Sequence, residues 1–267
     1  MLKKILKLTI YGITEGITEW LPVSSTGHLI ILEKFIKLNL NPTFNEFFLV
    51  FIQLGAVMAV ITKFFSKLNP IRINKGLKIN QKTIKLWIKI LIACIPVIII
   101  GLLFDEIINK KFYNVKTVSI SLIIVGILFI IINKVNVKNN SNITYKNAFI
   151  IGLFQVFSAI FPGVSRSGST IIGAELVGYN REIATEFSFY LAIPIMFGAT
   201  ILKLLKLIKN GIAITIQEIF ILIYSALIAY LVSILVIKLL TNFIKKHSFK
   251  IFGFYRIFLG FLMLLLF

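Results

Sequence analysis

Cysteine is almost absent from this 267-residue sequence. The only one is Cys94, which excludes an intrachain disulfide bond and any metal site built from several cysteines. Because Cys94 lies in an apolar run, we expect it to be a small buried hydrophobic residue. Acidic residues are also scarce, with 10 Asp and Glu against 29 Lys and Arg, and there are only two histidines, His28 and His247. Any chemistry that needs carboxylates or imidazoles therefore depends on very few side chains.

Apolar residues are abundant. They make up 58% of the chain, and the mean hydropathy is +0.96, more than the core of a soluble protein needs. The composition therefore predicts an all-α polytopic membrane protein. The net charge of +19 resides mostly in lysines between apolar runs, so we expect membrane lipids with anionic headgroups as its partner, and no nucleic acid.

A helix that crosses a membrane needs about 20 mostly apolar residues. Six runs qualify, namely 46–65, 84–104, 115–133, 184–207, 213–238 and 249–267. The first ten residues, MLKKILKLTI, are basic and apolar, but no small-residue cleavage site follows and two glutamates interrupt the run. We therefore expect no cleaved signal peptide.

The stretch YGITEGITEWLPVSSTGHLI, residues 11–30, carries unusual polarity for an apolar chain. Glu15 and Glu19 lie four residues apart and so share one face of a helix. Each charge costs about 2.5–3.5 kcal/mol at the centre of a membrane, which makes both residues functional candidates. Pro22 predicts a break in the helix, because the residue before a proline avoids the helical conformation. The serines and threonine that follow are typical of the start of a second helix.

A second stretch, IGLFQVFSAIFPGVSRSGSTIIG over residues 151–173, has the same layout about 140 positions later. Its Pro162 corresponds to Pro22, and Gln155 stands where Glu15 stands in the first copy. Hydroxyl side chains and Arg166 follow the second proline, where the first copy has His28. One copy is therefore acidic and the other supplies a cation.

Each proline-broken stretch, about 6–38 and 146–179, is predicted to be a re-entrant helix hairpin, tolerated where protein buries it or water lines it. Three expected spans follow each hairpin, and an odd number of crossings gives an inverted-topology repeat. We therefore predict a single transmembrane domain over 1–267, with repeat one at about 6–133 and repeat two at about 146–267. Two ordinary kinked spans are the alternative to the hairpins, and one missed helix would make the repeats parallel.

Basic residues indicate the orientation, since they are enriched in cytoplasmic loops. The densest basic block lies between the first two expected spans and consists of Lys63, Lys67, Arg72, Lys75, Lys78, Lys82, Lys85 and Lys89. Placing this block in the cytoplasm puts both termini and the mouth of the first hairpin outside the cell.

The polar residues of the two hairpins suggest phosphoryl transfer. Arg166 offers a planar charged fork that suits phosphate oxygens, and helix starts attract phosphate. Ser25 and His28 could form a nucleophile with its base, while Glu15 and Glu19 could orient that base or hold a divalent cation. Structural interpretations also exist, because Arg166 could simply neutralise a glutamate and a serine could bond to a backbone carbonyl.

EGITEWLPVSSTGHLI and PGVSRSGSTI resemble the two signature motifs of the undecaprenyl-diphosphate phosphatases, the bacitracin-resistance family, and EFFLVFIQLGA, EFSFYLAIPI and YRIFLG extend the resemblance over nearly the whole chain. The resemblance implies hydrolysis of undecaprenyl diphosphate in the bacterial plasma membrane for peptidoglycan synthesis. It also implies an inverted-repeat fold with re-entrant hairpins and a homodimer.

Carried over by motif, the resemblance implies catalytic roles for Glu15, Glu19, Ser25, His28 and Arg166. It implies phosphate binding by Ser24, Thr26, Ser165, Arg166, Ser167 and Thr170, and it suggests further phosphate contacts from Tyr255 and Arg256. Our hypothesis is that the diphosphate enters from outside, with Mg²⁺ or Ca²⁺ at Glu15 and Glu19 helping to neutralise it. Ser25 then attacks the terminal phosphorus or positions water, and His28 and Glu19 manage protons.

Three rival functions differ in what they require. A transporter or flippase shares the inverted-repeat architecture but would release no phosphate. A haloperoxidase-like lipid phosphatase needs a second His-Asp pair, and the only other histidine, His247, lies in a lysine-rich loop. A membrane scaffold would leave the two polar motifs unexplained.

Overall fold

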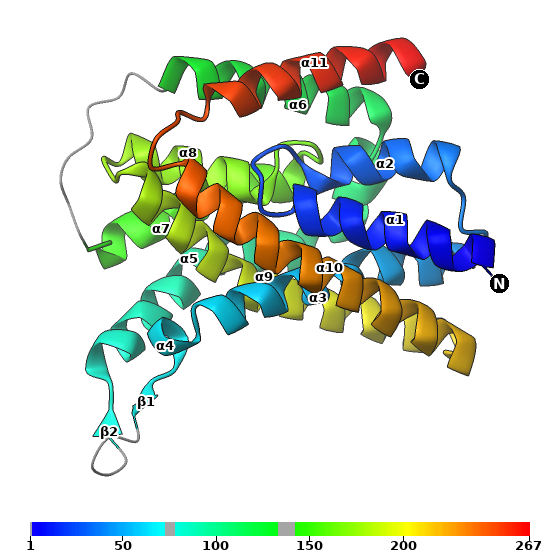
Figure 1. Ribbon diagram of the computed structural model, residues 1–267, viewed down its shortest axis with the longest axis horizontal. Helices are drawn as coiled ribbons and strands as arrows, with labels where there is room; N and C mark the ends of the chain where they lie inside the picture. Colours follow the sequence, from blue (N-terminus) through cyan, green and yellow to red (C-terminus); the bar gives the residue numbers. More distant parts are fainter. Residues whose placement is uncertain (1, 73–77, 133–141) are drawn as a thin grey trace.

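The computed structural model describes residues 2–72, 78–132 and 142–267. Most of these residues are helical (Figure 1). Two strands of two residues each, β1 and β2, pair in antiparallel fashion with Ile71 opposite Ile79. The elements are α1 (Leu2–Thr18), α2 (Ser25–Phe35), α3 (Pro42–Lys63), α4 (Phe65–Leu68), β1 (Ile71–Arg72), β2 (Lys78–Ile79), α5 (Gln81–Phe112), α6 (Val115–Ile132), α7 (Tyr145–Ile160), α8 (Arg166–Leu176), α9 (Arg181–Lys209), α10 (Ile216–Phe243) and α11 (Lys250–Leu266). The expected all-α class is confirmed.

Five helices of the described chain are long and apolar enough to cross a membrane, whereas the sequence predicted about six. The five are α3, the Gln81–Phe104 part of α5, α6, α9 and α10. The sixth expected span, 249–267, corresponds to α11, which has 17 residues. At 1.5 Å per residue α11 is about 26 Å long, less than the ~30 Å hydrocarbon core of a bilayer.

The basic block used for orientation is only partly a loop. Lys82, Lys85 and Lys89 belong to the first turns of α5, which begins at Gln81. Lys75 lies outside the described residues, as does position 133, where repeat one was expected to end.

Two helix-break-helix segments occur where the prolines predicted them. The first break separates α1 from α2, and the second separates α7 from α8. In each, a serine caps the second helix: Ser24 Oγ accepts from Gly27 N at 3.3 Å, and Ser165 Oγ accepts from Gly168 N at 3.2 Å. Both serines have positive φ values, 71° and 73°, which is uncommon outside glycine and concentrates at functional sites.

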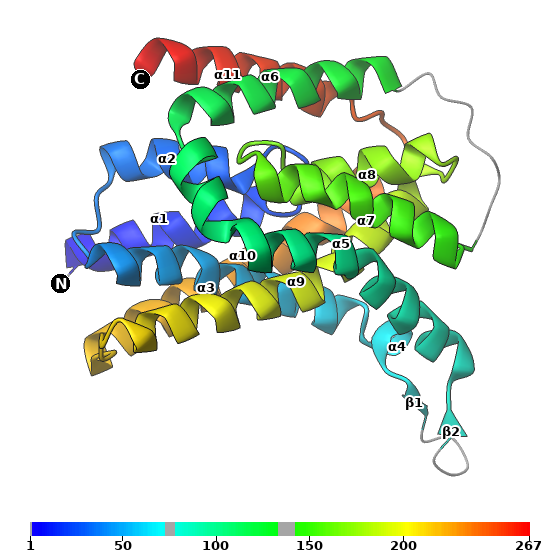
Figure 2. The same ribbon diagram turned by 180° about the vertical axis from the view of Figure 1, so that it is seen from behind.

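The four helices of these segments lie between two groups of longer helices. Figures 1 and 2 place α6 and α11 on one side of them and α3, α9 and α10 on the other. The packing partners are α6 with α11, α5 with α7, α10 with α3 and α1, and α9 with α3, α5 and α8. The breaks are therefore enclosed by protein, which satisfies the requirement for non-helical backbone inside a membrane protein.

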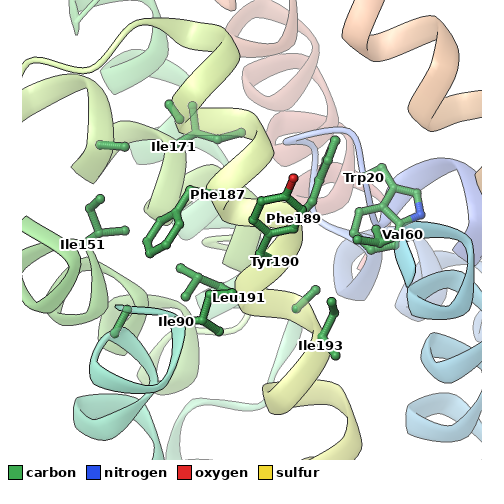
Figure 3. Packing of buried hydrophobic residues seen from close by; sticks show 14 of the residues in the cluster. Trp20, Val60, Ile90, Ile151, Ile171, Phe187, Phe189, Tyr190, Leu191 and Ile193 are labelled. Atoms are coloured by element: carbon green, nitrogen blue, oxygen red, sulfur yellow. The ribbon is translucent and has the colours of Figure 1, made fainter. Parts of the chain in front are cut away.

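The core is organised around α9, whose side chains Phe187, Phe189, Tyr190, Leu191 and Ile193 are buried. Figure 3 shows Phe187 and Leu191 near Ile90 and Ile151, while Phe189 points toward Trp20 and Val60. Trp20 belongs to the first break and packs edge-on against Phe189, with ring centroids 5.2 Å apart. Apolar packing therefore fixes the first break against α9.

Candidate active site

Glu19 connects the two breaks. Its side chain is buried, although it lies at the end of a helix in an apolar chain. Ser25 Oγ donates to Oε2 at 2.7 Å, and Arg166 Nη2 donates to Oε1 at 2.8 Å. The carboxylate therefore holds the first residue of α2 and the first residue of α8 at one point, and the expected meeting of the two motifs occurs here.

Arg166 is held on several sides. Besides its ion pair with Glu19, Nη1 donates to the Ser188 carbonyl on α9 at 2.6 Å. The guanidinium carbon lies 5.8 Å from the ring centroid of Trp20, which adds a cation–π attraction. Because its planar group is fixed by these contacts, Arg166 can present a constant edge to a ligand.

A pocket of about 140 Å³ opens beside this contact. A single water molecule needs ~10–15 Å³ on this measure, so the pocket has room for a phosphate group. Its lining combines the two breaks with α3, α7 and α9 and consists of Glu19, Ser24, Ser25, Thr26, Gln53, Ser158, Pro162, Gly163, Ser165, Arg166, Ile195, Met196 and Ala199. Two helix N-termini therefore border one cavity of mixed polar and apolar lining, and helix N-termini attract anions.

The predicted phosphate-binding hydroxyls fall into two groups. Ser24, Thr26 and Ser165 line the pocket, although Ser24 and Ser165 also cap their helices. Ser167 and Thr170 are buried outside the pocket lining. Thr170 Oγ1 lies 2.8 Å from Ser188 Oγ and so ties α8 to α9. Phosphate binding by Ser167 and Thr170 stays a prediction, since both lie outside the lining of this pocket.

His28 contacts a different partner from the one that its spacing suggested. Its Nδ1 lies 2.7 Å from the Ser24 carbonyl, and its Nε2 lies 2.6 Å from the Tyr255 hydroxyl. A carbonyl can only accept, so Nδ1 carries the proton and Nε2 of a neutral ring accepts from Tyr255. Both nitrogens are thus engaged, and the Ser25 hydroxyl donates to Glu19 instead.

Glu15 lies one helical turn before Glu19 and is completely buried. Neither of its carboxylate oxygens has a hydrogen-bond partner among the described residues, and the same holds for both polar atoms of Gln155. The expected Mg²⁺ or Ca²⁺ prefers carboxylate oxygens, so the free oxygens of Glu15 fit such an ion. No group of three or more His, Cys, Asp or Glu side chains gathers in the described chain, so a cation would need further oxygen ligands, from amide or carbonyl groups, water or a substrate.

Comparison with known proteins identifies the family of this chain. Residues 8–262 match the model of the family described as bacitracin resistance protein BacA. The chain belongs to the BacA family.

The chain is also similar, over nearly its whole length, to individual curated proteins. The protein named undecaprenyl-diphosphatase from Desulfitobacterium hafniense is 52% identical over 272 residues, which is 100% of this chain and 97% of that protein. The protein of the same name from Enterococcus faecalis is 52% identical over 95% of this chain and 94% of its own length. Undecaprenyl-diphosphatase 1 from Clostridium acetobutylicum is 51% identical over 96% of this chain and 95% of its own length.

Several residues at the site did not stand out in the sequence. Gln53 and Ser158 line the pocket, and Ser188 contacts both Arg166 and Thr170. Their common signal is weak, because each is an uncharged polar residue next to apolar neighbours in a largely apolar helix. Trp20, which contacts Arg166, could not be recognised from the sequence, because an aromatic residue in an apolar chain suggests only packing.

Proposed function

We infer that this chain is an integral-membrane phosphatase that hydrolyses undecaprenyl diphosphate to undecaprenyl phosphate and inorganic phosphate. Such an enzyme recycles the carrier lipid for peptidoglycan synthesis and confers bacitracin resistance. BacA membership and full-length relatives named undecaprenyl-diphosphatase support this reaction. The structural observation that carries the proposal is the joint contact of Ser25 and Arg166 with Glu19, beside a pocket bordered by two helix N-termini.

We propose that the two helix-break-helix segments are re-entrant hairpins of an inverted repeat in the bacterial plasma membrane, with the pocket open to the outside. The packing supports a repeat, because helices of one repeat contact helices of the other repeat, and equivalent helices make equivalent contacts. Helix α1 packs on α10, and its counterpart α7 packs on α5, the counterpart of α10. Two further sets of equivalent helices contact each other directly, α3 with α9 and α6 with α11. The homodimer implied by the family resemblance is part of this proposal.

The proposed reaction begins when the isoprenoid tail stays in lipid and the diphosphate enters the pocket. Arg166 and the two helix starts neutralise its oxygens. Ser25 Oγ attacks the terminal phosphorus, the bond to the bridging oxygen breaks, and undecaprenyl phosphate leaves. Glu19, 2.7 Å from Ser25 Oγ, accepts the serine proton. Water then cleaves the phosphoserine and releases inorganic phosphate; in the alternative, Ser25 positions a water that attacks directly.

His28 has a separate place in this scheme. The two nitrogens of His28 contact Ser24 and Tyr255, so Glu19 and not His28 accepts the proton of Ser25. We propose that His28 exchanges protons through the Tyr255 hydroxyl. Glu15, together with Glu19, would hold a divalent cation, which supplies charge neutralisation at the phosphate oxygens when bound.

A transporter or flippase is the competing function, because a pocket enclosed by two repeats also describes many transporters. The test is the release of inorganic phosphate by purified protein from detergent-solubilised undecaprenyl diphosphate. We expect the wild type to release phosphate and Arg166→Ala not to do so. Arg181→Ala is the control: it removes an arginine from a different ion pair and should still release phosphate. Absence of phosphate release by folded wild-type protein would favour the transporter.

A further inference from the structure

Arg256 lies on α11 and reaches into both breaks at once. Its side chain is completely buried. Nη1 donates to the Pro22 carbonyl at 3.0 Å, while Nη2 donates to the Gly163 and Val164 carbonyls at 2.7 and 2.9 Å. Pro22 belongs to the first break and the other two carbonyls to the second. One guanidinium therefore joins the backbones of two segments that are far apart in sequence.

The charge of Arg256 is not neutralised by an acidic side chain. None of the ion pairs in the described chain includes Arg256, and its partners are backbone carbonyls. Burying an unpaired guanidinium in a membrane protein is costly, so such residues are retained for function. The group also lies beside the first turn of α8, since a Cβ added to Gly168 would be 3.6 Å from Nη1. Arg256 therefore lies next to the helix start that carries Arg166.

Close packing of α11 on α6 sets how deeply Arg256 reaches. A Cβ on Gly253 would lie 2.6 Å from the Gly126 carbonyl, and a Cβ on Gly126 would lie 2.8 Å from the Gly253 carbonyl. Gly253 is one turn before Arg256 on α11. Helix α6 also supports the second break, because a Cβ on Gly163 would lie 2.5 Å from the Val118 carbonyl. The same helix thus holds both the arginine and one of the backbones that it binds.

Arg256 is not placed as a phosphate ligand. The pocket lining includes Pro162, Gly163 and Arg166, but not Arg256, whose guanidinium bonds to the backbone carbonyls of the breaks. The expectation that Tyr255 and Arg256 add phosphate contacts stays a prediction, which the experiment below tests for Arg256.

We propose that Arg256 is a positioning residue of the phosphatase: by tying the two breaks together it keeps Ser25 and Arg166 on Glu19, and it does so without touching the phosphate. The proposal rests on the phosphatase activity proposed above. A positioning role acts on the geometry of the reacting groups, where a displacement of about 1 Å can cost 10²-fold in rate. A direct phosphate contact would act mainly on substrate and product binding.

The test compares Arg256→Met and Arg256→Lys with wild type in detergent, measuring kcat, KM and inhibition by inorganic phosphate. We expect Arg256→Met to lower kcat about 10²-fold, with KM and the phosphate inhibition constant within about threefold of wild type. Arg256→Lys keeps a charge and three donors, so its kcat is expected to lie between that of the wild type and that of Arg256→Met. Leu259→Ala, also buried on α11 but packed with Val118 and Met263, is the matched control and should retain kcat.

A second route to the same geometry covers the case in which Arg256→Met does not fold. Gly253→Ala pushes α11 away from α6 next to Arg256, so it should lower kcat more than Leu259→Ala does, again with little change in KM. Wild-type kcat in folded Arg256→Met would overturn the proposal, as would equal kcat values for Arg256→Met and Arg256→Lys, or for Gly253→Ala and Leu259→Ala. A tenfold rise in the phosphate inhibition constant would instead make Arg256 a phosphate ligand. Because wild-type phosphate release is measured alongside, failure of the phosphatase assignment is distinguished from failure of this one.

Discussion

Ser25 and Arg166 occupy the same position in two helices and bond to opposite oxygens of one carboxylate. Each is the first residue after a capping serine with positive φ, and each donates to Glu19, at 2.7 and 2.8 Å. The proposed nucleophile and the proposed phosphate-binding cation are thus brought together by matched local structures. Neither half of the chain contains both groups, so the site depends on the association of the two halves.

Replacing Arg166 tests whether its fork or only its charge is needed. Arg166→Lys keeps the charge but cannot donate to Glu19 and the Ser188 carbonyl in the same fixed plane. We expect kcat/KM for phosphate release to fall about 10²–10³-fold in Arg166→Lys, and further in Arg166→Ala, the scale of losing one preorganised donor to a transition state. Steady-state kinetics on folded protein, with Arg181→Ala as the control, measure this. A loss of less than threefold in Arg166→Ala would remove Arg166 from the site.

Ser25 can be tested by looking for the covalent intermediate. If Ser25 is the nucleophile, acid-quenched enzyme should contain a phosphorylated peptide that includes Ser25, detected by mass spectrometry. Glu19→Gln should lower the rate of its formation, because the amide cannot accept the serine proton. Ser24→Ala, which removes the neighbouring cap hydroxyl, serves as the control and should still yield the modified peptide. Turnover in Ser25→Ala at the wild-type rate would exclude both roles proposed for the hydroxyl.

The sequence was sufficient to predict the breaks and much of the inventory at the site. Pro22 and Pro162 interrupt the helices where expected, because proline restricts the residue before it and cannot donate a backbone hydrogen bond. Glu19 and Arg166 could be expected to meet because unpaired charges in an apolar chain need partners. Local rules of this kind depend only on neighbouring residues, so they can be applied to a single sequence.

The hydrogen-bond partners of His28 and Arg256 could not be predicted from such local rules. Helical spacing placed His28 on the side of Ser25, but the ring bonds to Tyr255, which is 227 positions away on α11. Arg256 reaches carbonyls 93 and 234 positions away. Periodicity indicates which residues share a face, but not which helix covers that face. Those pairings follow from the packing of α11 on α6, for which the sequence shows only three glycines in long apolar runs.

Tyr255 is expected to act through His28. Tyr255→Phe removes the hydroxyl that lies 2.6 Å from His28 Nε2 but keeps the ring stacked on the imidazole, with an interplanar angle of 6°. We expect kcat to fall about tenfold with KM unchanged, because general acid–base contributions are of the order of 10²–10⁴ and the imidazole remains in place. Tyr224→Phe, which removes a hydroxyl bonded to Thr9, is the matched control.

A double-mutant cycle separates this role of Tyr255 from general damage. In a His28→Ala background, Tyr255→Phe should cost little or nothing further, since the two residues act as a unit. Additive losses in the double variant would mean that Tyr255 does not work through His28.

Glu15 is the residue through which the proposed cation can be tested. Its two oxygens are buried and have no hydrogen-bond partner among the described residues, whereas Glu19 already accepts bonds from Ser25 and Arg166. We expect chelation to abolish phosphate release by the wild type, and Mg²⁺ or Ca²⁺ to restore it. Glu15→Gln gives the first repeat the residue that Gln155 supplies in the second, and should raise the cation concentration for half-maximal activity at least about tenfold. Gln155→Leu, which removes another side chain whose buried polar atoms have no hydrogen-bond partner among the described residues, should leave that concentration unchanged. An unchanged concentration in Glu15→Gln would place the cation elsewhere, and wild-type activity that survives chelation would eliminate it.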